Sequence, residues 1–219
     1  MSARCFTLHE IAVLEAWFVE RGRLRDRMLL LLGVNVGYRI TELLSVTVGQ
    51  VLSPAGDVAH EVIVPRSRLK GGAGVRKRSV QGRRVVLNGP ARAAIRDYLA
   101  SLDHVPAHHE FLFRSREGGN RPLHRSQVHR ILQDACLAAG VNATRVSTHS
   151  LRKTFVRAVY DASGKDIVLC QRTVGHQSVT TTARYLDSTQ SELDDLVLSI
   201  GSQPPASASA SAVMTARAA

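Results

Sequence analysis

The chain has 219 residues, and its 29 Lys and Arg against 18 Asp and Glu give a formal net charge of +11 at pH 7. This length fits one domain, or one domain with a small appendage, and it can bury a sizeable core without disulfides. The three cysteines are scattered without a zinc motif, the longest apolar run, around Met28 to Val36, is too short to cross a membrane, and no signal peptide pattern is recognisable, so we expect a protein of the reducing cytoplasm.

The first third of the sequence predicts helices, because apolar residues recur at helical spacing. These helices are expected over Leu8–Glu20, Leu24–Val36 and Ile40–Val46. Gly37 is a typical end for the second of them.

The pattern then changes to that of a hairpin. Glu61–Val64 and Arg84–Leu87 are runs typical of β-strands. Between them lie four residues of Gly-Gly-Ala-Gly and a basic cluster, and the segment from Arg66 to Arg84 holds eight basic residues and no acidic one. We therefore expect a long-looped hairpin with a strongly basic loop.

The rest of the chain again favours helices, apart from a short extended piece at Phe111–Ser115. The predicted helices are Ala91–Leu102 after Pro90, His124–Ala139, Ser150–Tyr160, Lys165–Val174 and Val179–Tyr185. The expected fold class is therefore mixed α/β, predominantly helical, with a small antiparallel sheet.

Charge points to the kind of partner. The 29 basic residues comprise 25 Arg and four Lys, and the planar guanidinium matches phosphate geometry. A large positive excess favours a polyanion, most often nucleic acid, although an Arg-rich proteome would give the same composition.

Three short motifs stand out, and each is weak when taken alone. His149 and Arg152 form an HxxR pair on one side of a helix start that Ser147 or Thr148 could cap. His176 follows Gly175, and Tyr185 stands nine residues later. The third motif is the segment GYRITELL around Arg39, where Arg39 could simply pair with Glu42 on the surface.

The order of these motifs makes them specific. The chain has, in this order, an early Arg, a basic hairpin with Lys, an HxxR pair, Gly-His and a Tyr nine residues after that His. With these motifs in this order, it resembles the tyrosine recombinase, or phage integrase, family over about residues 5 to 200. The resemblance implies the catalytic domain fold of that family over residues 1–186. It also implies that Arg39 is the first catalytic Arg, His149 and Arg152 the HxxR pair, His176 the His-or-Trp position, and Tyr185 the nucleophile.

The family's hairpin Lys is matched less firmly. Lys70 best fits that position, and Lys77 remains the alternative because the loop is longer than usual. Lys165 opens a later helix, and Lys153, as the neighbour of Arg152, is expected to point elsewhere.

The resemblance implies a chemistry and a set of partners. Tyr185 would attack a DNA phosphate held by Arg39 and Arg152, His149 would relay its proton, His176 would hold a phosphate oxygen or position Tyr185, and Lys70 would protonate the departing 5′-oxygen. The covalent phosphotyrosine conserves the bond energy, so no cofactor and no metal is expected. Double-stranded DNA is the expected partner, with accessory DNA-bending proteins and a location at the bacterial nucleoid when DNA is bound.

The C-terminal end is expected to form an appendage. Residues 187–200 carry four acidic residues and an apolar stripe at helical spacing. The family resemblance implies that this helix docks on a neighbouring protomer in a homo-oligomer on DNA, and the alternative is that it folds back on its own domain. The Ala/Ser-rich residues 201–219 are expected to be disordered.

One departure from the family leaves the function open to alternatives. Arg39 has 38 residues before it, which read as helices of the catalytic domain, so the family's N-terminal DNA-clamping domain is expected to be missing, either naturally or by truncation. The function implied is site-specific DNA recombination. The alternatives are a non-catalytic DNA-binding or regulatory relic of the same fold, or a relaxing type IB topoisomerase.

Overall fold

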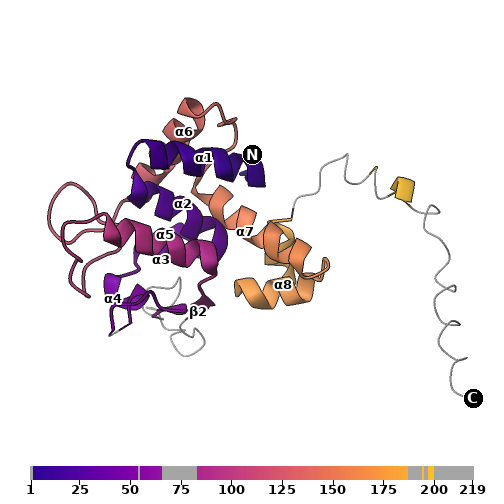
Figure 1. Ribbon diagram of the computed structural model, residues 1–219. Helices are drawn as coiled ribbons and strands as arrows, with labels where there is room; N and C mark the ends of the chain where they lie inside the picture. Colours follow the sequence, from indigo (N-terminus) through magenta and orange to yellow (C-terminus); the bar gives the residue numbers. More distant parts are fainter. Residues whose placement is uncertain (1, 54, 66–82, 187–193, 195–196, 200–219) are drawn as a thin grey trace, which may run out of the picture. The chain divides into compact units, whose positions relative to one another are not determined.

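The computed structural model describes residues 2–53, 55–65, 83–186, 194 and 197–199. Its elements are α1 (Leu8–Glu20), α2 (Leu24–Val36), α3 (Ile40–Leu44), α4 (Val48–Val51), β1 (Glu61–Val64), β2 (Arg83–Val86), α5 (Gly89–Ala100), α6 (Arg125–Ala138), α7 (Thr148–Ala162), α8 (Ile167–Val174) and α9 (Val179–Ala183). The predicted fold class, mostly helical with a small antiparallel sheet, is confirmed (Figure 1). In the described part of the chain, every helix is too short or too polar to span a membrane.

The chain divides into two compact units, residues 1–185 and residues 186–219. All of the elements named above belong to the first unit. In the second unit, residues 194 and 197–199 are helical, and Val197 is exposed.

Local chemistry fixes the ends of the first two helices where the sequence predicted them. The Thr7 hydroxyl accepts a hydrogen bond from the Glu10 backbone N–H at 3.1 Å, and the Glu10 carboxylate accepts one from the Thr7 N–H at 2.9 Å, which is a capping box. Gly37 ends α2 with a φ of 63°, the left-handed conformation that favours glycine.

Helix α2 is the centre of the first unit. It packs against α1, α5 and α7, which surround it in Figure 1. Most of its residues are buried, and a Cβ placed on Gly33 would lie 2.7 Å from Cδ1 of Leu151 in α7. The absence of a side chain at Gly33 therefore lets α2 and α7 approach closely, which brings the end of α2 beside the start of α7.

The two strands form an antiparallel pair in which Glu61 is opposite Val86 and Val64 is opposite Arg83. Val62 and Val64 face the core, whereas Ile63 is exposed, the alternation typical of a half-buried strand. The Tyr38 hydroxyl donates to the Val62 carbonyl at 2.9 Å and so ties the hairpin to the turn after α2. Lys70 and Lys77 lie between the strands, outside the described residues.

Two local features differ from what periodicity indicates. Helix α4 was not predicted, and the short extended piece predicted at Phe111–Ser115 has an isolated bridge near each end, from Phe111 to Thr47 and from Arg114 to Pro122, rather than a strand. Both depend on backbone pairing between segments distant in the sequence, such as the Val48 N–H with the Glu110 carbonyl at 2.9 Å, which periodicity does not contain.

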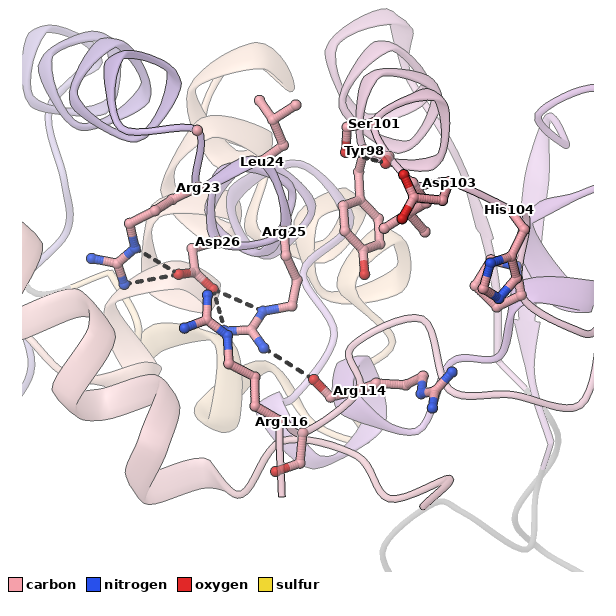
Figure 2. Close-up of a pocket in the computed structure, with 14 residues that line it drawn as sticks. Arg23, Leu24, Arg25, Asp26, Tyr98, Ser101, Asp103, His104, Arg114 and Arg116 are labelled. Carbon is pink, nitrogen blue, oxygen red and sulfur yellow. Dashed lines mark hydrogen bonds and ion pairs between the residues drawn. The ribbon is translucent and has the colours of Figure 1, made fainter. Parts of the chain in front are cut away.

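A buried carboxylate fixes the start of α2. Asp26 accepts hydrogen bonds from Arg23 at 2.9 Å and from Arg25 at 2.9 and 3.0 Å, and Arg25 also donates to the Arg114 carbonyl at 3.0 Å (Figure 2). These groups line a cavity of about 480 Å³ between the start of α2 and the end of α5. Since Arg23 and Arg25 are both engaged by Asp26, the cluster anchors α2 to the loop that carries Arg114.

Replacing Asp26 by Asn should destabilise the fold, because two partly buried guanidinium groups would lose their carboxylate. Removing one partner of a buried ion pair costs about 3–5 kcal/mol, and the partial exposure of both arginines favours the lower end of that range. Urea unfolding measures the loss. Asp103→Asn, at an exposed position lining the same cavity, is the control and should change the free energy of unfolding by less than about 0.5 kcal/mol. Equal losses would contradict the role assigned to Asp26.

Candidate functional site

The buried side chain of Arg152 lies at the centre of the candidate site. Arg152 is 2% exposed, and its guanidinium donates one hydrogen bond to the Gly37 carbonyl and another, at 3.3 Å, to the Val174 carbonyl. These carbonyls are at the end of α2 and the end of α8. One side chain of α7 therefore joins the end of α8 to the end of α2, which is 115 residues away from Arg152 in the sequence.

Tyr185 lies against this centre. The Arg152 guanidinium carbon is 5.8 Å from the centre of the Tyr185 ring, and the His176 ring centre is 5.1 Å from it with an interplanar angle of 32°. Tyr185 follows α9 in a turn, where its N–H donates to the Thr182 carbonyl at 2.9 Å. The Tyr185 ring is thus held by contacts with two of the residues that the sequence had grouped with it.

His176 is itself buried and oriented. Its Nδ1 lies 2.9 Å from the Thr182 hydroxyl oxygen, and Thr182 is completely buried. Gly175 ends α8 in the left-handed conformation, with a φ of 66°, so the chain turns sharply and directs His176 inward. No sequence motif marked Thr182; its place six residues after His176 becomes meaningful only because α9 folds back and brings the two side chains together.

His149 and Tyr185 share a cavity of about 300 Å³, whose lining comprises Ser2, Ala3, Ser147, His149, Lys153, Arg184 and Tyr185. Ser147 caps α7, and its hydroxyl accepts a hydrogen bond from the His149 N–H at 3.2 Å, so the cap that the sequence suggested sets the position of His149. The His149 side chain is exposed.

The expectation that Lys153 points elsewhere was wrong, because Lys153 lines the same cavity as His149 and Tyr185. The physical reason is helical geometry. Lys153 follows His149 by four residues, and residues four apart lie on the same face of a helix. Adjacency to Arg152 in the sequence therefore did not mean that Lys153 points away from this cavity.

The Arg39 side chain extends to the surface and is held by the buried carboxylate of Glu42. Its side chain is 43% exposed, whereas the side chain of its partner Glu42 is 2% exposed. Glu42 accepts a hydrogen bond from the Arg39 backbone N–H at 2.9 Å and one from the guanidinium at 2.8 Å. The pair is therefore half-buried, and Arg39 stands two residues after the carbonyl that Arg152 binds.

The structure thus brings four of the named side chains into contact or into one cavity, namely His149, Arg152, His176 and Tyr185. Arg39 lies next to the turn that Arg152 anchors. Lys70 and its alternative Lys77 are outside the described residues, so both remain predictions from the sequence.

Comparison with known proteins identifies the family. The model of the phage integrase family matches residues 10–192. The chain belongs to the phage integrase family. Over 180 residues it is 27% identical to the probable integrase/recombinase YoeC of Bacillus subtilis, covering 82% of the chain and 86% of YoeC. Over 153 residues it is 33% identical to the tyrosine recombinase XerD of Caulobacter vibrioides, covering 68% of the chain and 45% of XerD.

Solved structures show the same fold. The crystal structure of XerA recombinase matches with a TM-score of 0.68 at 22% identity, covering 93% of this chain and 66% of that one. XerH site-specific recombinase bound to a palindromic difH substrate matches with a TM-score of 0.67 at 18% identity, covering 91% of this chain and 53% of that one. The chain spans about half the length of XerD and of XerH. The integrase-family chain therefore has the tyrosine recombinase catalytic domain fold that the sequence resemblance implied.

Gly37→Ala should destabilise this integrase fold through two effects. An alanine at a φ of 63° costs about 1–2 kcal/mol, and its Cβ would lie 2.0 Å from Cδ1 of Phe155, which adds about 1–3 kcal/mol for overpacking. Gly22→Ala is a matched control, because Gly22 has a φ of 61° and open space around its Cα. Urea unfolding should therefore show a larger loss at Gly37 than at Gly22. Equal losses would mean that the Phe155 contact does not constrain the turn before Arg39.

Proposed function

We propose that the chain cuts and rejoins double-stranded DNA as the catalytic part of a site-specific tyrosine recombinase, through a covalent 3′-phosphotyrosine. The observation that carries the proposal is the contact of the Tyr185 ring with Arg152 and His176 beside the cavity that also holds His149. A nucleophile, a proton acceptor and cationic groups for a phosphate are the parts that such a reaction needs. The DNA-bound structures of XerH and of the Tn1549 transposon integrase, which share this fold, support DNA as the partner.

In the proposed reaction the Tyr185 hydroxyl oxygen attacks the phosphorus of a DNA phosphodiester. A tyrosine hydroxyl is a weak nucleophile near neutral pH, so its proton passes to His149 as the new bond forms. The bond from phosphorus to the 5′-oxygen breaks, and Lys70 supplies a proton to that oxygen. The 3′-phosphate stays on Tyr185 until another 5′-hydroxyl attacks and the steps run in reverse.

The cations stabilise the charge that develops on the phosphate. Arg39 and Arg152 would bind its non-bridging oxygens, since an Arg guanidinium offers paired donors to such oxygens. Arg152 is buried and fixed by two backbone carbonyls, so its orientation is set before DNA binds. His176, held by Thr182, would position the Tyr185 ring or bind a phosphate oxygen.

The organisation and assembly of the protein extend this proposal. Residues 1–186 would form the catalytic domain, residues 187–200 a docking helix and residues 201–219 a disordered tail. The chain would assemble as a homo-oligomer on DNA, with residues 187–200 of one copy docked on a neighbouring copy. Binding of two copies to one DNA raises their effective concentration, so a weak contact between them is sufficient. Accessory DNA-bending proteins would be further partners in this assembly.

Tyr185→Phe should abolish covalent adduct formation, because it removes the attacking oxygen and keeps the ring between its neighbours. The measurement is a denaturing gel of protein trapped on a nicked half-site duplex, the half-site being selected by the wild-type chain from a random pool. Binding of intact DNA should change less than twofold. An adduct formed by the Phe variant would overturn the assignment of Tyr185, and a wild-type chain that binds but never forms an adduct would favour the non-catalytic relic.

Lys70→Ala should slow strand cleavage by about 10²–10⁴-fold, the usual contribution of general acid catalysis. A substrate with a 5′-bridging phosphorothiolate has a leaving group that needs little protonation, so it should restore most of the rate. Lys77→Ala is the matched control and should retain cleavage of ordinary DNA. If Lys77→Ala is slow and rescued by sulfur while Lys70→Ala is not, Lys77 is the general acid.

A further inference from the structure

A buried lysine in the Tyr185 cavity has no part in the reaction described above. Lys153 is 4% exposed and extends from the same face of α7 as His149. It lines the cavity of about 300 Å³ together with Tyr185 and Arg184. The family resemblance assigned no role to this position.

The surroundings of Lys153 come partly from the N-terminal segment. The Lys153 ammonium donates a hydrogen bond to the Ser2 hydroxyl at 3.0 Å. That segment is itself held by α7 and by the turn before it: Arg145 donates to the Ser2 carbonyl at 2.9 Å, and the Phe6 N–H donates to the Thr154 hydroxyl of α7 at 2.8 Å. Ser2 and Ala3 therefore form a fixed wall of the cavity on the side of Lys153.

Burial of an ammonium group has an energetic cost, because its hydration is lost. At the wall of the Tyr185 cavity, an anionic ligand would be attracted to this cation and would offset part of that cost. Lys165 shows the contrast within the described residues, since it is exposed on the surface, where a lysine costs little. Charged groups buried beside a reactive residue are typical of functional sites.

The lining also indicates the class of ligand. His149, Lys153 and Arg184 give the described part of the lining, which Tyr185 shares, three basic side chains. A lysine ammonium lacks the paired donors of Arg, but it binds phosphate as a point charge. A volume of about 300 Å³ is at the lower end of the range for ligand sites, so it would hold one phosphate group with its sugar rather than a base pair.

We infer that Lys153 binds a phosphate of the DNA strand at the Tyr185 cavity, as a phosphate contact additional to those of Arg39 and Arg152. This inference rests on the proposed function. It makes Lys153 a binding residue whose charge, rather than its hydrogen bond to Ser2, is required.

The salt dependence of DNA binding tests the inference. Each phosphate neutralised by a cation adds about −0.9 to the slope of log K against log salt concentration on duplex DNA. Lys153→Met should therefore make the slope less steep by about 0.9 and lower the rate of adduct formation, whereas Lys153→Arg should keep the wild-type slope. The measurement is fluorescence anisotropy of the full chain with the selected half-site duplex, at a series of KCl concentrations.

Three further variants separate charge from structure. Lys165→Met removes a surface charge outside the cavity, and Ser2→Ala removes the hydrogen bond but keeps the lysine; both should leave the slope unchanged. Lys153→Gln removes the charge but keeps a donor for Ser2, so it replaces the Met variant if that one fails to fold, and it should show the same reduced slope.

The result that overturns the inference is an unchanged slope for a folded Lys153→Met or Lys153→Gln variant, or an equally reduced slope for Ser2→Ala. A lower melting temperature with an unchanged slope would assign Lys153 to structure alone. Failure of the proposed function is seen separately, because the wild-type chain would then form no adduct with the nicked duplex whatever the slopes.

Discussion

The buried guanidinium of Arg152 is the interaction on which the site depends. It hydrogen-bonds the carbonyl of Gly37 and the carbonyl of Val174, so the turn after α2 and the end of α8 are both fixed to α7. Withdrawing either carbonyl would leave a charged group buried without that partner, which is costly in a low-dielectric interior. The segments that carry Arg39 and His176 are therefore both tied to the helix that carries His149.

Around Arg152, buried side chains fix the positions of neighbouring groups, and exposed side chains extend to the surface. His176 and Thr182 are buried and hydrogen-bonded to each other, and the buried Glu42 carboxylate binds the Arg39 guanidinium. His149 is exposed, and the Arg39 side chain is 43% exposed. A large, flexible substrate such as DNA can meet the outer groups only at the surface, whereas their positions are set by groups from which water is excluded.

Close packing of α2 against α7 makes this arrangement possible. At Gly33 and Gly37 any side chain would meet Leu151 or Phe155 of α7, so both glycines are required by contact as well as, at Gly37, by backbone conformation. The N-terminal segment adds a second layer on α7 through Ser2 and Phe6. Helix α7 is therefore covered on several sides, and its residues His149 and Lys153 line the Tyr185 cavity.

The sequence by itself determined the bounds of α1 and α2 and the family, whereas the later helices begin or end up to two residues from their predicted bounds. Thr7 with Glu10 and Gly37 act through neighbouring backbone groups, so α1 and α2 begin and end as predicted, and the order of Arg39, the HxxR pair, Gly-His and Tyr185 identified the family before any geometry was known. Only the tertiary structure decided which face of α7 lies beside Tyr185, and with it the place of Lys153. Helical spacing gives the angle between two side chains, but the direction in which that face points is set by packing between segments more than 100 residues apart, as in the bond from Arg152 to Gly37.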